Sequence, residues 1–232
     1  MPLRRSVSCA RRGASPERER CRSRTSPAIR FATLAALSLV ALAPARAQKL
    51  QFRQLTPDNG VSSSLIQTIV RDSRGFMWFG TRKGINRYDG YTFSVYRHKA
   101  DDSTTVGDNN TTVAYEDAQK TLWVGTPAGL SRYDREHDTF RNFVIKPGVH
   151  IEVGAILEAQ GVLWVGTTRG LYKFDRASGK ATPYLPEQFG TSDVEAIFED
   201  SRKHLWVGGK GAGAREIDPA TGTTKRWSID PD

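Results

Sequence analysis

Thr121-Leu122-Trp123-Val124-Gly125-Thr126 occurs, with small changes, four times in this chain. The other copies are FMWFGT at residues 76–81, VLWVGT at 162–167 and HLWVGG at 204–209. Successive copies of the tryptophan stand 45, 41 and 42 residues apart. A nearly constant period close to forty is the signature of a repeat architecture, in which each repeat is one supersecondary unit.

Each repeat contains short apolar stretches separated by turn residues, which is typical of an all-β unit. The first repeat has four expected strands, at residues 65–71, 76–81, 84–88 and 91–96. Four antiparallel strands in forty-odd residues form the blade of a β-propeller. The sequence therefore predicts an all-β fold, a β-propeller of four-stranded antiparallel blades. The expected blades span approximately residues 61–97, 106–144, 149–185 and 191–228.

The apolar residues of each copy are continuous, as expected for strands that are covered on both faces. In Leu163-Trp164-Val165, leucine and valine are expected to face one neighbouring blade and tryptophan the other. Gly166 lies on the same side as Trp164 and leaves room for a closely packed ring or backbone. The four tryptophans are therefore interpreted as core residues and not as a platform for sugar stacking: Trp78, Trp123, Trp164 and Trp206.

Acidic and glycine residues also recur at fixed distances from the tryptophans. An acid stands six residues before each, where a tight turn is expected: Asp72, Asp117, Glu158 and Asp200. A ring of metal ligands is the alternative interpretation, but turn capping explains each acid locally. Lys120 and Lys203 replace the turn glycine of the first repeat, Gly75, so these turns need another geometry or strain a non-glycine residue.

Residues 1–47 are expected to be an export signal. Nine arginines and a largely apolar 13-residue run at 31–43 precede the small-x-small site Ala45-Arg46-Ala47, with cleavage predicted after Ala47. The apolar run is too short for a membrane anchor, which needs about 18 residues. The mature portion, residues 48–232, then lies in the periplasm and contains no cysteine, so disulfides and thiolate chemistry are excluded there.

The net charge of +9 belongs almost entirely to that leader. After residue 47 there are 24 of the 34 basic and 23 of the 25 acidic residues, a net charge of +1. A nucleic-acid-binding domain carries a concentrated basic patch, which this distribution does not provide. No nucleic acid partner is therefore expected.

Glu116-Asp117, Leu122 to Thr126 and Gly129-Leu130-Ser131-Arg132-Tyr133-Asp134 together resemble the two-component regulator propeller repeat. The resemblance covers nearly all of residues 50–227. It implies the periplasmic sensor region of a hybrid histidine kinase or a diguanylate cyclase, present here as an N-terminal fragment. The resemblance places the output domains and a membrane helix downstream, and it allows a dimer in the full-length receptor.

Propellers usually close with four to eight blades. No closing blade is evident among the four repeats, so we expect an incomplete ring. Residues 51–56 are expected to form a strand that precedes the first blade. An unclosed ring would expose a blade face of several hundred Å². A closed four-bladed ring and an independent secreted repeat protein are the alternatives.

No catalytic, cofactor-binding or metal-binding residue is predicted, and no cofactor is expected. His98, His137, His150 and His204 fall at unrelated repeat positions. Loops that carry Lys83, residues 97–102 and residues 210–212 are accessible, but the ligand-binding residues remain unassigned. The expected partner is a small molecule or carbohydrate, and the expected function is ligand sensing without enzymatic activity. A secreted propeller enzyme of the lyase or glycosidase type and a passive interaction scaffold are the alternatives.

Overall fold

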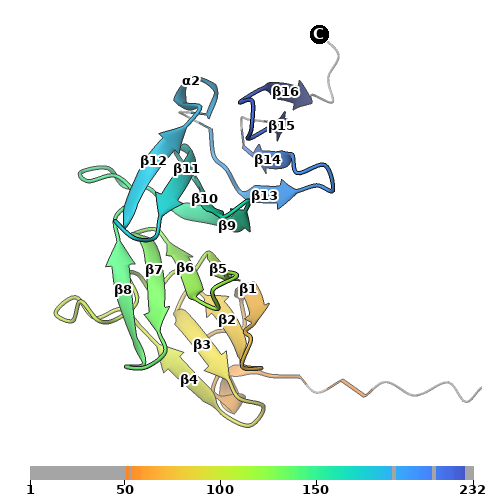
Figure 1. The fold of residues 1–232 in the computed structure, drawn as a ribbon. Coiled ribbons are helices and arrows are strands. Elements are labelled where there is room, and N and C mark those ends of the chain that lie inside the picture. Colours follow the sequence, from red (N-terminus) through yellow and green to blue (C-terminus); the bar gives the residue numbers. More distant parts are fainter. Residues whose placement is uncertain (1–50, 53, 190–191, 211–212, 228–232) are drawn as a thin grey trace, which may run out of the picture. The chain divides into compact units, whose positions relative to one another are not determined.

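Four separate antiparallel sheets follow one another along the chain, each with four strands in sequence order (Figure 1). The computed structural model describes residues 51–227 apart from 53, 190–191 and 211–212, and the described residues from 54 on belong to one compact unit. The expected leader at 1–47 lies outside the described residues. The predicted fold class is confirmed: the sheets are blade-like and consistent with a partial propeller.

The strands of the first sheet are β1 (Ile66–Arg71), β2 (Met77–Thr81), β3 (Gly84–Tyr88) and β4 (Phe93–Tyr96). Those of the second sheet are β5 (Val113–Glu116), β6 (Leu122–Thr126), β7 (Gly129–Asp134) and β8 (Thr139–Phe143). The third sheet contains β9 (Val153–Ala159), β10 (Val162–Thr167), β11 (Gly170–Asp175) and β12 (Lys180–Tyr184). The fourth contains β13 (Ala196–Glu199), β14 (Leu205–Gly209), β15 (Gly213–Ile217) and β16 (Thr224–Trp227).

Helical structure is confined to two short segments of the described chain, the 3₁₀ turn η1 (Pro57–Asn59) and the helix α2 (Pro186–Phe189). Neither is long or apolar enough to span a membrane. The predicted strand at residues 51–56 is wrong, because the described residues of this segment are not in a strand. A strand needs a hydrogen-bonded neighbour, and among the described residues this segment has no ladder partner.

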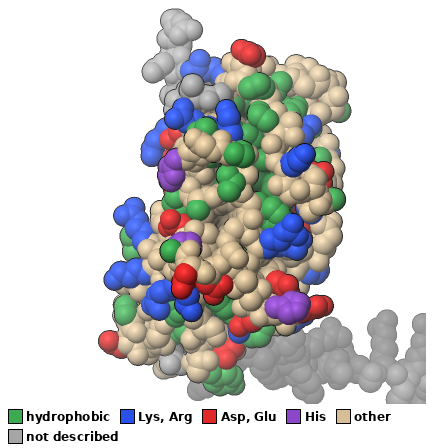
Figure 2. Space-filling model, turned by 90° about the vertical axis from the view of Figure 1, so that its left-hand side faces the viewer, with side chains coloured by type: hydrophobic (Ala, Val, Ile, Leu, Met, Phe, Trp, Pro, Cys, Tyr) green, Lys and Arg blue, Asp and Glu red, His purple; other side chains and the backbone are tan. Residues whose placement is uncertain are grey.

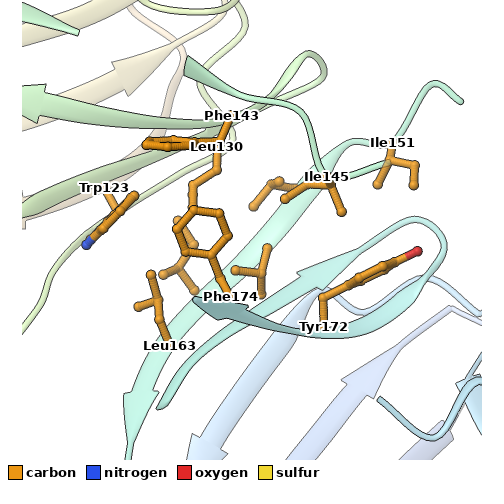
Figure 3. Packing of buried hydrophobic residues seen from close by; sticks show 11 residues of the cluster. Trp123, Leu130, Phe143, Ile145, Ile151, Leu163, Tyr172 and Phe174 are labelled. Atoms are coloured by element: carbon orange, nitrogen blue, oxygen red, sulfur yellow. The ribbon is translucent and has the colours of Figure 1, made fainter. Parts of the chain in front are cut away.

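Successive sheets pack through their tryptophans. The Trp78 ring contacts Tyr133 of the second sheet edge-on, with ring centroids 4.9 Å apart. Trp123 contacts Phe174 of the third sheet in the same way at 5.3 Å, within the cluster drawn in Figure 3. Leu163 of β10 belongs to this cluster too, so its face meets the preceding sheet. The predicted division of faces, with tryptophan toward one neighbour and leucine toward the other, is confirmed.

Glycine two residues after the tryptophan permits this close approach. A Cβ atom added to Gly125 would lie 2.7 Å from Cγ1 of Val153, which enters the next sheet. One added to Gly166 would lie 2.5 Å from Cγ1 of Val194 and 2.9 Å from its carbonyl oxygen. All three distances are shorter than a Cβ atom tolerates, so any side chain here would push the sheets apart.

A buried aspartate connects each of the first two sheets to the next. Asp72 accepts hydrogen bonds from the indole Nε1 of Trp78 (2.9 Å) and from Nη1 of Arg135 in the second sheet (2.8 Å). Asp117 likewise accepts from Trp123 Nε1 (2.8 Å) and from Nε of Arg176 in the third sheet (3.1 Å). Burial alone would raise the pKa of Asp72, but these donors outweigh it and hold the pKa below its ordinary value.

The third sheet departs from the predicted pattern. Glu158 does not begin a turn. It lies in β9 and pairs with Leu163 of β10, just as Glu116 of β5 pairs with Leu122 of β6. The reason is a shorter turn, in which only Gln160 and Gly161, both at positive φ, separate the paired ends of β9 and β10. Ala159 therefore takes the place of the capping aspartate. The buried Nε1 of Trp164 consequently has no hydrogen-bond partner among the described residues.

Lys120 and Lys203 retain the turn geometry of Gly75, and they do so at left-handed φ values of 65° and 68°. Each donates its backbone N–H to the carbonyl oxygen of the aspartate three residues earlier, as Gly75 does, at 2.9 to 3.0 Å. Of the two predicted possibilities, strain on a non-glycine residue is therefore the one that occurs.

Candidate functional site

The connections between sheets and the turns between the second and third strands lie on the same side of the sheets. Thr111, which enters the second sheet, donates its N–H to the carbonyl oxygen of Thr81 at 2.8 Å. Val194, which enters the fourth sheet, donates to the carbonyl oxygen of Thr167 at 2.9 Å. These segments are the loops of the fold, and loops on a rigid sheet scaffold are where binding residues are usually carried.

A cleft of about 340 Å³ opens on this side next to the third sheet. It is bordered by the connection that precedes β9, by the turn between β10 and β11, and by α2. Its lining residues are Lys146, Val149, Ile151, Arg169, Gly170, Leu171, Tyr172, Pro183, Tyr184, Pro186 and Phe189. The volume lies in the range of small-molecule sites.

Buried apolar anchors hold the connection that forms one wall. Ile145 and Ile151 are 5% and 3% exposed and pack into the cluster between the second and third sheets (Figure 3). Residues 146–150 between them are exposed. This arrangement places Lys146 at the rim of the cleft on a short loop with two fixed ends.

The turn that carries Arg169 is held by the threonine of the repeat. Thr167 Oγ1 accepts the N–H of Arg169 at 3.0 Å and donates to the carbonyl oxygen of Gly170 at 2.9 Å. Gly170 has a φ of 99°, and a Cβ atom there would lie 2.9 Å from the carbonyl oxygen of Phe189. Glycine therefore allows α2 to lie close to the turn.

Aromatic side chains form the floor of the cleft. Tyr172 and Phe189 are 5% and 1% exposed, and Tyr184 is half-buried. In Figure 3 the Tyr172 hydroxyl points away from the apolar cluster. Burial raises the pKa of both tyrosines, so their hydroxyls stay neutral and able to donate a hydrogen bond near pH 7.

Two cations border this aromatic floor. Lys146 and Arg169 are exposed, and neither forms an ion pair with another described residue. Cations beside aromatic rings and neutral hydroxyls can hold a ligand that has an apolar face and an anionic or strongly polar group. No such combination was identified from the sequence, because its members come from three separate segments.

A second cleft, of about 350 Å³, lies at the corresponding place beside the second sheet. The loop at 97–102 that the sequence marked as accessible contributes His98 and Asp102 to it. The loop is ordered by its own contacts: Asn109 Oδ1 accepts the His98 N–H at 2.9 Å, and Lys99 donates its N–H to Thr105 Oγ1 at 3.0 Å.

The other accessible positions do not converge on one site. Lys83 is exposed in the turn between β2 and β3. Lys210 forms an ion pair with Glu195 at 3.2 Å, and residues 211–212 lie outside the described chain. Among the histidines, His137 contacts Asp134 at 2.9 Å in an exposed turn, and His150 is exposed.

His204 belongs to a polar cluster on the fourth sheet. Its Nδ1 lies 2.8 Å from Glu216 Oε1, and possible metal-ligand atoms of Asp200, His204 and Glu216 lie within 4.8 Å of one another. Arg202 occupies this cluster, with Nη2 2.7 Å from Glu216 and 3.2 Å from Asp200. The guanidinium offsets part of the charge of the two carboxylates, and the cluster is a hydrogen-bonded ion network.

Charges of both signs are interspersed on the face shown in Figure 2, with hydrophobic side chains between them. No broad basic area is visible among the described residues on that face.

Comparison with known proteins identifies the repeat. The family model described as "two component regulator propeller" matches residues 60–83, which confirms the resemblance seen in the sequence. Histidine kinase P4 of Formosa agariphila is 44% identical over 55 residues, which cover 24% of this chain and 4% of that protein.

Solved structures with a similar fold include extracellular domains of two hybrid two component systems from B. thetaiotaomicron. The first has a TM-score of 0.67 at 24% identity over 76% of this chain, and the second 0.60 at 24% over 69%. Virginiamycin B lyase from Staphylococcus aureus has a TM-score of 0.56 at 17% identity over 77% of this chain and 58% of the lyase. These likenesses show the fold alone. The chain spans about a quarter of the length of the two extracellular domains, 26% and 24%.

Proposed function

We propose that this chain is the ligand-recognition part of an extracytoplasmic signalling receptor. The observation that carries the proposal is the two-component regulator propeller repeat at residues 60–83. The sheets that surround it resemble extracellular domains of hybrid two component systems, and a histidine kinase contains a related segment. The export signal predicted at residues 1–47 agrees with a periplasmic or extracellular location.

The cleft beside the third sheet is the proposed ligand site. Tyr172 and Tyr184 would cover an apolar face of the ligand, and Lys146 and Arg169 would contact its anionic or strongly polar groups. A carbohydrate fragment with an acidic group has this combination of features. Signalling would then require that the ligand bind two states of the receptor with different affinities.

The test is a binding screen by isothermal titration calorimetry, with neutral oligosaccharides and carboxylate- or sulfate-bearing ones as probes. The proposal predicts saturable binding that Lys146→Ala and Arg169→Ala each weaken by roughly 10- to 100-fold, the effect of one lost charge-assisted hydrogen bond. Lys180→Ala, an exposed change outside the cleft, is the matched control and should leave the dissociation constant unchanged.

Two results would count against the proposal. Equal binding by the wild-type chain and the two cleft variants would place the ligand elsewhere. Conversion of a bound oligosaccharide to products, followed by chromatography, would favour the secreted enzyme that the sequence left as an alternative.

A further inference from the structure

Two residues of the fourth repeat differ in chemistry from their counterparts in the first three repeats, and both can bind a metal ion. The residue that pairs with the repeated tryptophan on the neighbouring strand is basic in the first three sheets and is Glu216 in the fourth. The residue two positions before the tryptophan is His204 in the fourth repeat. The counterparts of Glu216 are Arg87, Arg132 and Lys173, and those of His204 are Phe76, Thr121 and Val162.

These two residues meet at the aspartate of the repeat. His204 Nδ1 lies 2.8 Å from Glu216 Oε1, and ligand atoms of Asp200, His204 and Glu216 all lie within 4.8 Å of one another. Atoms bound to one Zn²⁺ ion at about 2.1 Å stand roughly 3–4 Å apart, so small side-chain rotations bring the three into place. One imidazole nitrogen and two carboxylate oxygens form a donor set that Zn²⁺ accepts.

The two carboxylates are mostly buried, and an exposed cation balances them. The side chains of Asp200 and Glu216 are 18% and 13% exposed, whereas that of Arg202 is 63% exposed. The Nη2 atom of Arg202 lies 3.2 Å from Asp200 Oδ2 and 2.7 Å from Glu216 Oε1, so a positive charge already stands between the carboxylates. Buried charges are paired or coordinate metals. Because an exposed ion pair contributes little, a divalent ion can displace the arginine.

Two indole N–H groups orient the carboxylates. Trp206 Nε1 donates to Asp200 Oδ2 at 3.1 Å, and Trp227 Nε1 donates to Glu216 Oε2 at 3.3 Å. Asp200 Oδ1 also accepts the backbone N–H of His204 at 3.0 Å. Hydrogen-bond partners that orient the ligands from outside are characteristic of protein metal sites. Both acids are therefore held in place by groups that an incoming ion need not displace.

A cleft of about 370 Å³ adjoins this cluster. His204 and Glu216 form part of its wall, and its other lining residues are Asp218, Thr221, Thr223, Thr224 and Lys225. A Zn²⁺ ion with three protein ligands keeps a fourth position for water or for an oxygen atom of a bound molecule. The cleft provides space for that fourth ligand.

We propose that Asp200, His204 and Glu216 bind a divalent transition-metal ion such as Zn²⁺, in place of Arg202. His204 binds through Nδ1, the nitrogen that contacts Glu216, and keeps its ring proton on Nε2. The two carboxylates balance the two charges of the ion. The imidazole nitrogen favours Zn²⁺ over Mg²⁺ and Ca²⁺, which prefer oxygen ligands. The site belongs to the fourth sheet and does not depend on the ligand proposed for the cleft beside the third.

The test is isothermal titration calorimetry of the whole chain, purified without a polyhistidine tag, with Zn²⁺, Mg²⁺ and Ca²⁺ as separate probes. Zn²⁺ should bind saturably and more tightly than the other two ions. His204→Ala and Glu216→Gln should each weaken Zn²⁺ binding by on the order of 100-fold, because loss of a supporting partner alone costs roughly 10- to 100-fold. Arg202→Gln should instead strengthen Zn²⁺ binding by roughly 3- to 10-fold, since it removes a competing cation.

His137→Ala supplies the matched control and should leave the Zn²⁺ affinity unchanged. His137 contacts Asp134 at 2.9 Å but belongs to no three-ligand cluster in the described part of the chain. Circular dichroism of each metal-free variant shows whether it folds. Because Arg202 is exposed, Arg202→Gln still decides the question if a ligand variant does not fold. Equal Zn²⁺ affinity of the wild type and His204→Ala, weaker binding by Arg202→Gln, or tighter binding of Mg²⁺ or Ca²⁺ than of Zn²⁺ overturns the proposal.

Discussion

Removal of the Asp72 carboxylate should weaken the packing of the first sheet against the second and lower the free energy of unfolding. The side chain of Asp72 is fully buried, and that of Arg135 is 14% exposed. Asp72→Ala leaves Arg135 and the Trp78 indole N–H without their shared acceptor. Breaking a buried charge pair by deleting one partner typically costs 3–5 kcal/mol, so we expect the free energy of unfolding to fall by about that amount.

A double-mutant cycle isolates the bond between the sheets. Asp72→Asn keeps a side-chain oxygen that can accept the indole N–H but removes the charge, and should cost about 1.5–3 kcal/mol. Arg135→Ala also removes the contact with Glu116 at 2.5 Å. The loss in free energy of unfolding for this variant therefore exceeds the loss due to the Asp72 contact alone. The coupling energy between the two changes should be about 1–3 kcal/mol.

The assay is equilibrium unfolding in urea, followed by far-ultraviolet circular dichroism for the wild type, both single variants and the double variant. The exposed pair Asp134 and His137 is the matched control, and its coupling should stay below about 1 kcal/mol. If the two changes at Asp72 and Arg135 add to within about 0.5 kcal/mol, the reasoning that these groups join the sheets is refuted.

Two further predictions concern acid stability and the packing glycines. The folded pKa of Asp72 lies below its ordinary value of 3.8, so its carboxylate stabilises the fold above that pH, and this contribution is lost as the pH falls through the folded pKa. Urea midpoints measured between about pH 5 and pH 2 should therefore fall less steeply for Asp72→Asn than for the wild type, and parallel curves would contradict this. Gly166→Val should lower the free energy of unfolding by about 1–3 kcal/mol because its Cβ would lie 2.5 Å from Val194, whereas Gly208→Val should change it by less than about 0.5 kcal/mol. Thermal melts of the two variants would contradict the packing argument if both shifted equally.

Sequence periodicity was sufficient to predict the sheets and their faces. The repeated tryptophans predicted the unit, and alternation along Leu163-Trp164-Val165 predicted that leucine and valine meet one neighbour and tryptophan the other. Both predictions rest on local pattern, because a strand places successive side chains on opposite faces. The glycine notch at Gly166 was predictable for the same reason.

The sequence-based predictions failed where the structure of a segment depends on the segment or sheet beside it. Glu158 occupied the expected spacing from Trp164, yet a turn shortened by one residue moved it into β9. Trp206 carries the same motif as Trp123 but is half-buried, because no described sheet covers it. The segment at residues 51–56 has strand-like composition, but its described residues have no ladder partner in the described chain.

The candidate cleft could not have been predicted from repeat positions. Lys146, Tyr184 and Arg169 come from a connection, a strand end and a turn, and these vary between repeats. Their proximity is a consequence of how the loops pack. The repeated Thr167 is the part of this site that the sequence does indicate, since it holds the turn that carries Arg169.

The claim that Trp78 and Trp123 face a following sheet, whereas no described sheet covers Trp206, is tested most directly by the indole N–H groups. The chain has five tryptophans, and nitrogen-15 labelling makes their indole hydrogen exchange measurable one by one by nuclear magnetic resonance. We predict slow exchange for Trp78 and Trp123, which are buried and hydrogen-bonded to aspartate, and fast exchange for Trp206 and Trp227. Equal exchange at all of these positions, or faster exchange at Trp123 than at Trp206, would contradict the account.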